Sequence, residues 1–333
     1  MTNIRDVAHA AGVSVATVSR VLHTPEKVSE QVRKTVLKAV KETNYQPNMM
    51  ARRLRTKKAY AVMVIVSHLT NPFYATVISG IQSVAQQRGY TVLLGESGGD
   101  PEVEDQYAAF ASSKQVDGVI QLGERLPSSL KPLVEREHPF PFVNACEFWD
   151  PTTYPTVGID NRKSFADITR YVLDHGHRII AHIKGPDDNP VTHHRVEGYK
   201  EALINAGLTP DPDLIVDGDF SIEAGSRAAA HLLSLASPPT AIVSANDEMA
   251  IGVIRTIKES GQSVPSDISV AGFDDIHFAK YTDPPLTTVS QPAADIGGQA
   301  AALLFDAIDN KLISNRTIRI PTNLVVRDSV KAI

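Results

Sequence analysis

Hydrophobic residues change their spacing along the chain at about residue 60. Before it, apolar residues recur every three or four positions, which is typical of amphipathic helices. Beyond it, unbroken apolar runs such as AVMVIV at 61–66 and RIIAHI at 178–183 alternate with helical stretches. Apolar strands separated by helices are typical of parallel sheets that helices cover on both faces. The pattern therefore predicts a small all-α head followed by a larger α/β body.

The head is predicted to form three helices. Asn3 can cap the first, Ser14 the second and Ser29 the third. Gly12 suits the chain reversal between the first two helices, because that turn requires a positive φ. The residues expected to face the core are Ile4, Val7, Ala8 and Ala11, then Val18, Val21 and Leu22, then Val32, Val36, Leu37 and Val40. Two helices joined by a short glycine turn make a helix-turn-helix.

The body is predicted to form two lobes, because its alternation of strands and helices restarts at about residue 163. Apolar runs lie at 61–66, 91–95, 117–122 and 140–144, and again at 178–183, 214–216, 241–245 and 268–273. Each set predicts a doubly wound parallel sheet, in which ligands bind beyond the carboxyl ends of the strands. The expected fold class is α/β, with an all-α head and two such lobes.

Charge is distributed unevenly between head and body. Residues 1–58 carry twelve Lys and Arg against four Asp and Glu, whereas the remaining 275 residues carry 21 against 34. A basic head on an acidic body indicates that the head meets a polyanion. A solvated basic segment or a protein-binding knob would carry the same charge, so the residue pattern has to decide.

The second helix carries side chains suited to reading DNA. Arg20 can donate two hydrogen bonds to the N7 and O6 atoms of guanine, and Val15 and Ala16 can contact a thymine methyl. The side chains predicted to contact phosphates, and so to position the head without reading sequence, are Ser14, Thr17, Ser19, Ser29 and Lys34. The head is therefore predicted to bind double-stranded DNA.

Polar and aromatic residues gather where the predicted strands of the body end. They are Asn71–Tyr74, Glu96, Gly123–Arg125, Cys146, Glu147, His193–Arg195, Phe220, Asn246, Asp247, Asp274 and Asp275, with Gln291 where the chain crosses back. An arginine among acids and amides suits a hydroxyl-rich ligand, and aromatic side chains offer faces for a ring. The body is therefore predicted to bind a small polar molecule.

The sequence resembles the LacI/GalR family of bacterial regulators along essentially its whole length. In the head the resemblance rests on IRDVAHAAGVSVATVSRVL, KVSEQVRKTV and NYQPNMMARRLRTKKA. In the body it rests on NPFYATVISGI, KQVDGVI, GHRIIAHIKGP, RVEGYKEAL, ANDEMAIG, SVAGFDD and DPPLTTVSQP. It implies a transcriptional repressor that binds a palindromic operator as a homodimer under the control of a small-molecule effector.

The resemblance also implies domain boundaries and a body similar to periplasmic sugar-binding proteins. The implied domains are a DNA-binding domain at 1–45, a hinge at 46–60, an N-lobe at 61–160 and 291–321, and a C-lobe at 161–290 and 322–333. The hinge would fold as a helix in the DNA minor groove, where Leu54 wedges into a base step. Its neighbours in that groove would be Ala51, Arg52 and Arg55.

The same resemblance assigns residues to base reading and to the effector site. Base reading would fall to Val15, Ala16 and Arg20, and the effector contacts would come from Phe73, Tyr74, Arg195, Asn246, Asp274 and Gln291, with Phe220 and Cys146 nearby. LGERLP at 122–127, GPDD at 185–188 and GDFSIEAGSRA at 218–228 resemble the nucleoside-responsive, cytidine-type members. The expected effector is thus a nucleoside, with a purine or a sugar as alternatives.

Catalytic, metal and membrane sites are not predicted. His193 and His194 are adjacent rather than four residues apart, so they do not suit zinc on one helix face. The lone cysteine fits a reducing cytoplasm, and no apolar run is long enough to span a membrane. No catalytic residue and no cofactor is expected. The alternatives on the same two-lobed fold are a solute-binding protein, which would lack the head, and an enzyme, which would turn over its ligand.

Overall fold

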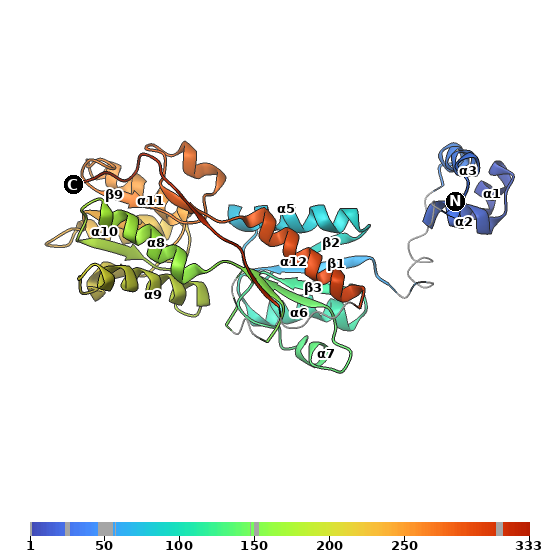
Figure 1. The fold of residues 1–333 in the computed structure, drawn as a ribbon, viewed down its shortest axis with the longest axis horizontal. Coiled ribbons are helices and arrows are strands. Elements are labelled where there is room, and N and C mark those ends of the chain that lie inside the picture. Colours follow the sequence, from blue (N-terminus) through green and yellow to red (C-terminus); the bar gives the residue numbers. More distant parts are fainter. Residues whose placement is uncertain are drawn as a thin grey trace. The chain divides into compact units, whose positions relative to one another are not determined.

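The computed structural model describes residues 2–23, 27–45, 56, 58–146, 148–149, 153–310 and 316–333. The chain divides into two compact units, 1–58 and 59–333 (Figure 1). The predicted hinge contacts, Ala51, Arg52, Leu54 and Arg55, lie outside the described residues, as does Glu147. Each unit has a hydrophobic core of its own.

The first unit is a three-helix head made of α1 (Ile4–Ala11), α2 (Val15–His23) and α3 (Glu30–Glu42). Asn3 caps α1 through a reciprocal capping box with Asp6, and Gly12 ends the helix with a φ of 64°. The backbone N–H of Thr17 donates to the hydroxyl of Ser14 at 3.1 Å, which caps α2. The buried side chains of all three helices form one cluster. The predicted helix-turn-helix is confirmed.

Two predicted details of α3 are wrong. Ser29 precedes the helix, but its side chain makes no capping hydrogen bond. Leu37 is 48% exposed, whereas Ala39 is 2% exposed. The buried face follows Val36, Ala39 and Val40 at helical spacing, and Leu37 lies about 100° around the helix from Val36.

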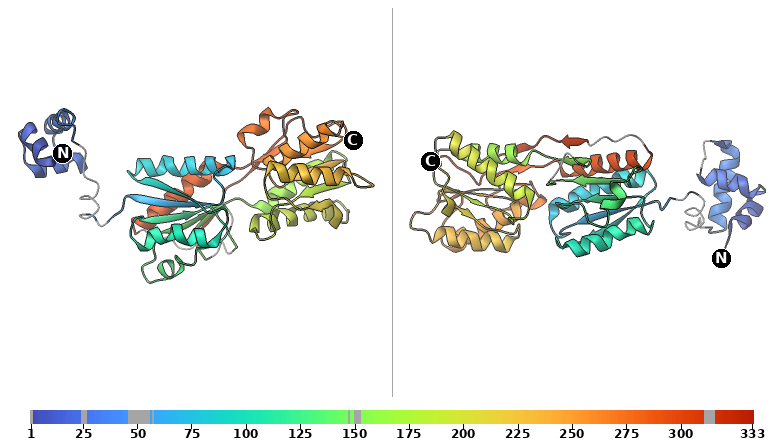
Figure 2. Two further views of the ribbon diagram at one scale, coloured as in Figure 1. Left: turned by 180° about the vertical axis from the view of Figure 1, so that it is seen from behind. Right: turned by 90° about the horizontal axis from the view of Figure 1, so that it is seen from below.

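The second unit contains two parallel sheets, and that of the N-lobe has the strand order β11-β5-β4-β3-β1-β2. The strands are β1 (Ala61–Val66), β2 (Thr91–Glu96), β3 (Gly118–Gln121), β4 (Phe142–Ala145), β5 (Thr156–Gly158) and β11 (Thr317–Arg319). One face is covered by α5 (Pro72–Gln87) and α12 (Ala293–Ile308), the other by α6 (Pro101–Ser112) with the short α7 (Lys131–Val134) nearby (Figure 2). Val62 and Val64 pack on the first face, and Met63 and Ile65 on the second. Burial on both faces explains why the β1 run is continuously apolar.

The sheet of the C-lobe has the order β7-β6-β8-β9, with every neighbouring pair parallel. Its strands are β6 (Ile180–Ile183), β7 (Ile215–Val216), β8 (Ala241–Ser244) and β9 (Ser269–Ala271). Its helices are α8 (Asn161–Asp174) and α9 (Pro190–Asn205) on one face, and α10 (Ile222–Leu233) and α11 (Asp247–Glu259) on the other (Figure 2). Short 3-10 helices lie at Pro212–Leu214 and His277–Tyr281. The predicted pair of doubly wound lobes is confirmed.

Three crossings of the chain join the lobes. β5 ends in the N-lobe sheet at Gly158, and α8 begins in the C-lobe at Asn161. The other two crossings run through an antiparallel ribbon of β10 (Thr288–Ser290) and β12 (Asn323–Val325), because β10 leads to α12 and β11 leads to β12. The hydrophobic pattern predicted neither these crossing strands nor α12 as elements. The strands have three residues each, and α12 is apolar around most of its circumference, so neither shows a clear periodicity.

Glycines at their crossing bring α5 and α12 into close contact. A Cβ on Gly80 would lie 2.1 Å from the carbonyl oxygen of Ala294, and one on Gly297 would lie 1.9 Å from that of Val77. No side chain fits at either position unless the helices separate. This contact fixes α5, whose first turn supplies aromatic side chains to the site described next.

Candidate functional site

A cleft opens where the strands of both sheets end. Its walls are formed by Asn71, Phe73, Tyr74, Cys146, Ile159, Asn161, Asn189, Val191, Arg195, Phe220, Asn246, Asp274 and Gln291. The space between these side chains, including the open solvent at the mouth of the cleft, is about 500 Å³. All eight residues predicted to contact an effector line this one cleft.

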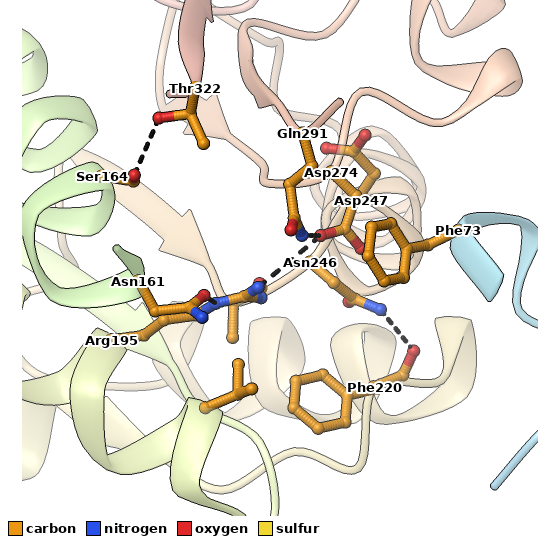
Figure 3. Close-up of polar contacts among 12 residues, drawn as sticks. Phe73, Asn161, Ser164, Arg195, Phe220, Asn246, Asp247, Asp274, Gln291 and Thr322 are labelled. Atoms are coloured by element: carbon orange, nitrogen blue, oxygen red, sulfur yellow. Dashed lines mark hydrogen bonds and ion pairs between the residues drawn. The ribbon is translucent and has the colours of Figure 1, made fainter. Parts of the chain in front are cut away.

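Arg195, on α9, lies at the centre of the polar wall (Figure 3). Its Nε donates to Oδ1 of Asn161 at 2.9 Å, and its Nη1 donates to the carbonyl oxygen of Ala245. Its guanidinium carbon lies 3.9 Å from the centre of the Phe273 ring. The side chain is 4% exposed, so these contacts hold the guanidinium in one orientation.

Asp274 faces Arg195 from the loop after β9. Its Oδ1 lies 3.7 Å from Nη2 of Arg195 and accepts a hydrogen bond of 2.7 Å from Nε2 of Gln291. Burial raises the pKa of Asp274 to about 6, against the lowering effects of Arg195 and Gln291. The carboxylate is therefore incompletely stabilised, and hydrogen-bond donors on a ligand would stabilise it further.

Two further acids, Asp247 and Glu248, lie in the first turn of α11. Asp247 accepts from the hydroxyl of Thr288 at 2.6 Å and from the backbone N–H of Ile276 at 2.8 Å. Burial and then the charge of Asp274 raise the pKa of Asp247, and the same two effects raise that of Glu248 to about 7. The bond from Ile276 to Asp247 supports the loop that holds Asp274.

Asn246 and Phe220 are linked on the C-lobe side of the cleft. Asn246 caps α11 by accepting from the N–H of Met249 at 3.0 Å, and its Nδ2 donates to the carbonyl oxygen of Phe220 at 2.9 Å (Figure 3). Phe220 has a φ of 67°, and its ring packs against Gly185, where a Cβ would lie 2.1 Å from Cζ. The link fixes a backbone conformation that a residue with a side chain rarely adopts.

The N-lobe supplies aromatic side chains from the first turn of α5. Asn71 caps this helix by accepting from the N–H of Phe73 at 2.9 Å. The rings of Phe73 and Tyr74 lie edge to face with their centres 5.4 Å apart. Burial, followed by the nearby groups of Cys146 and Glu124, raises the pKa of Tyr74, so its hydroxyl remains a hydrogen-bond donor.

Five residues of the cleft wall were not among the predicted effector contacts: Asn71, Ile159, Asn161, Asn189 and Val191. Asn71 and Asn189 occupy matching places, because each is an N-cap followed by proline at the start of a helix. An Asn-Pro pair after an apolar strand is a readable sign of such a helix start. Asn161 has no comparable signal, since its contact with Arg195 joins two helices that lie far apart along the chain.

Two observations hold for the part of the chain that the structure describes. No group of three or more His, Cys, Asp or Glu there could hold a metal ion, and no helix there is long and apolar enough to cross a membrane. Nε2 of His193 bonds to the carbonyl oxygen of Asp187 at 2.6 Å. The cleft wall offers three aromatic side chains, an arginine, five amides and the acid Asp274, which suit a ring that carries hydroxyl groups.

The residues predicted to contact DNA lie on or just before α2 and α3. Val15 is 41% exposed, and Ala16 and Arg20 are also exposed on α2. The hydroxyls of Ser14 and Thr17 lie 2.9 Å apart, and Ser19 is half-buried on the same helix. Lys34 forms an exposed pair of 3.2 Å with Glu30. The first turn of α2 thus presents a short apolar and hydroxyl surface with an arginine one turn further on.

Comparison with known protein families gives two matches along the chain. Residues 3–48 match the family described as bacterial regulatory proteins, lacI family. Residues 169–330 match the family described as periplasmic binding protein-like domain. The first match covers the helix-turn-helix, and the second covers most of the C-lobe and the later crossings.

Similar proteins match over the full length. The HTH-type transcriptional repressor CytR of Escherichia coli (strain K12) is 39% identical over 330 residues, which cover 99% of this chain and 96% of CytR. The HTH-type transcriptional repressor PurR of Vibrio vulnificus (strain CMCP6) is 34% identical over 335 residues, covering 100% of both.

Solved structures of transcriptional regulators also match over the full length. The lac repressor dimer bound to operator and the anti-inducer ONPF has a TM-score of 0.86 at 27% identity, covering 99% of both chains. A complex of the transcriptional regulator CelR with cellobiose has a TM-score of 0.74 at 33% identity, covering 99% of this chain and 100% of that one. Head and body thus occur together, in this order, in repressors.

Proposed function

Since this chain belongs to the lacI family of bacterial regulatory proteins, we propose that it represses transcription as a homodimer on a palindromic operator, with a nucleoside in its cleft as effector. The observation that carries the effector proposal is the Arg195–Asp274 pair beside the rings of Phe73 and Phe220. The rings suit a base, while Asp274 and the amides suit the hydroxyls of a sugar. A full-length match to repressors favours regulation over solute transport or catalysis.

Ligand and DNA binding are coupled in this proposal through the two lobes. The cleft takes residues from both, so a ligand that contacts both favours one relative orientation of them. A ligand changes this equilibrium only through its different affinities for the two orientations. In a two-fold symmetric dimer the orientation sets the spacing of the two heads, which has to match the two half-sites.

The experiment for the effector is a thermal-shift screen followed by operator titration. Cytidine, adenosine, hypoxanthine and ribose are each added to the full chain, and a binder at 100 times its Kd should stabilise the fold by about 2.7 kcal/mol. The binder is then included in a titration of operator DNA. A change of operator affinity in either direction supports the proposal, and a nucleoside that binds without any such change refutes it.

We propose that base reading rests on Val15, Ala16 and Arg20, with backbone contacts from Ser14, Thr17, Ser19, Ser29 and Lys34. Arg20→Ala is expected to lose roughly 1–3 kcal/mol of discrimination at the base pair that Arg20 reads, because a bidentate contact to guanine is lost. The measurement is the affinity for an operator and for single-base variants of it. The assignment is wrong if the preference at every position survives the substitution.

Lys34→Ala serves as the matched comparison on α3. A phosphate contact carries no sequence information, so this variant should weaken binding evenly across the operator variants. The slope of log affinity against log salt concentration should fall by about 1. A loss confined to particular base pairs would instead place Lys34 in the groove.

A further inference from the structure

Two contacts join the lobes at the exposed rim of the cleft. Nδ2 of Asn189 in the C-lobe donates to Oε1 of Glu124 in the N-lobe at 2.8 Å. The ring of Trp149 in the N-lobe lies 5.3 Å from that of His193 in the C-lobe. Trp149 is 54% exposed, and the N–H of Trp149 donates to the carbonyl oxygen of Glu124 at 3.3 Å. These four residues, called the rim latch below, therefore act as one unit.

The C-lobe half of the rim latch belongs to the helix that carries Arg195. Asn189 is the N-cap of α9, and its Oδ1 accepts from the N–H of Val191 at 2.8 Å. One end of the amide thus fixes the helix, while the other end crosses to the N-lobe. Because a helix turn is rigid, Asn189, His193 and Arg195 move together.

The hydrogen bond at the rim involves a charged acceptor in a partly dry place. Glu124 and Asn189 are both half-buried, and burial is the main reason that the pKa of Glu124 is raised. The neighbouring Arg125 directs its guanidinium to the carbonyl oxygen of Gly99 at 3.0 Å and towards Glu104 at 3.4 Å. A hydrogen bond to a carboxylate is stronger than one between neutral groups, and more so out of water.

We propose that Glu124 and Asn189 are positioning residues that hold the lobes closed, so that their hydrogen bond sets the affinity of the cleft for its ligand. Phe73 and Tyr74 reach the cleft from the N-lobe, and Arg195 from the C-lobe. A ligand that needs both walls binds only the closed state, so its apparent affinity falls with the fraction of molecules that are closed. The ligand part of this inference rests on the proposed function, whereas the closure itself does not.

The test is an exchange of the two polar groups. Asn189→Asp keeps a good N-cap for α9 but replaces the donor with a carboxylate that faces Glu124, so the latch should open. Glu124→Gln combined with Asn189→Asp restores a donor and an acceptor in the reversed order, so the latch should close again. Asn205→Asp, at the exposed last residue of α9, makes the same chemical change away from the rim.

The first readout is fluorescence of the ligand-free chain, because Trp149 is its single tryptophan. Asn189→Asp should shift the emission, the double variant should return it towards the wild type, and Asn205→Asp should leave it unchanged. The second readout is the affinity for cytidine, which should fall about tenfold in Asn189→Asp and recover in the double variant.

The outcomes separate this inference from the proposed function. If cytidine does not bind the wild type, the emission of the ligand-free variants still decides whether the latch exists. An emission that Asn189→Asp leaves unchanged overturns the inference. The inference is also overturned if adding Glu124→Gln to Asn189→Asp restores neither the emission nor the affinity, since Asn189 would then act without Glu124.

Discussion

Arg195→Ala is expected to destabilise the body by about 3–5 kcal/mol at neutral pH and to abolish the response to ligand. Asp274 is 8% exposed, and its ion pair of 3.7 Å with Arg195 would be lost. Breaking one side of a buried pair leaves an uncompensated charge, which is the costly outcome. Asn161 and the carbonyl oxygen of Ala245 would lose their donor as well. Urea unfolding of the full chain measures the change in the free energy of unfolding.

Two further variants show whether the buried charge is the cause. Arg195→Ala with Asp274→Asn removes both charges, so much of the lost stability should return while the ligand response stays absent. Arg195→Lys keeps a charge but not the planar fork, and it should lie between the wild type and Arg195→Ala. A loss below about 1 kcal/mol in Arg195→Ala would contradict the electrostatic account.

His182 is expected to make the C-lobe sensitive to acid. Its titration should lower the free energy of unfolding by about 3 kcal/mol between neutral pH and pH 4. Its ring lies among buried groups on β6, 4.6 Å from the centre of Phe165 and 5.3 Å from that of Tyr199. Burial lowers its pKa from 6.5 to about 4, despite the bond of 2.9 Å to the carbonyl oxygen of Val243. Between these values the unfolded chain binds a proton that the folded chain does not. The contribution of neutral His182 to the free energy of unfolding is therefore fully present above pH 6.5 and is lost as the pH falls towards 4.

The measurement is the free energy of unfolding of wild type and His182→Gln from pH 7 to pH 4. Glu248 and Asp274, with pKa values raised to about 7 and about 6, contribute the opposite slope, because their folded forms hold protons that the unfolded chain releases. The difference between the two curves isolates His182, since these acids are common to both proteins. A difference that stays constant over this range would refute the prediction.

The sequence predicted much of the lining of the cleft because the topology carries most of the information. Once alternating strands and helices indicate parallel sheets, their carboxyl ends must meet at one edge. Asp274 lies in the loop after its strand, whereas Phe73 and Arg195 lie on the helices that follow theirs. The resemblance to the family then selected eight residues near these strand ends, and all eight line one cleft.

The errors and omissions concern positions that no local pattern specifies. Leu37 lies next to buried Val36 in sequence, and only the packing of α3 on its neighbours turned it outward. The contact of Asn161 with Arg195 and the pairing of Glu124 with Asn189 each join segments that lie far apart along the chain. Residues that a second segment places cannot be inferred from the first segment alone.

The crossings between the lobes have a consequence for the order in which parts of a newly made chain can fold. β1 to β5 exist once residue 158 has been made, but α12 and β11 lie at 293–319. At about 5–20 residues per second, the ribosome needs roughly 10–30 s to supply them. During that interval one face of the N-lobe sheet has α5 but lacks α12, the second of its two covering helices. The head depends on contacts within 42 residues and can fold at once. Each nascent copy of the regulator thus carries a folded DNA-binding head before its body can bind any ligand.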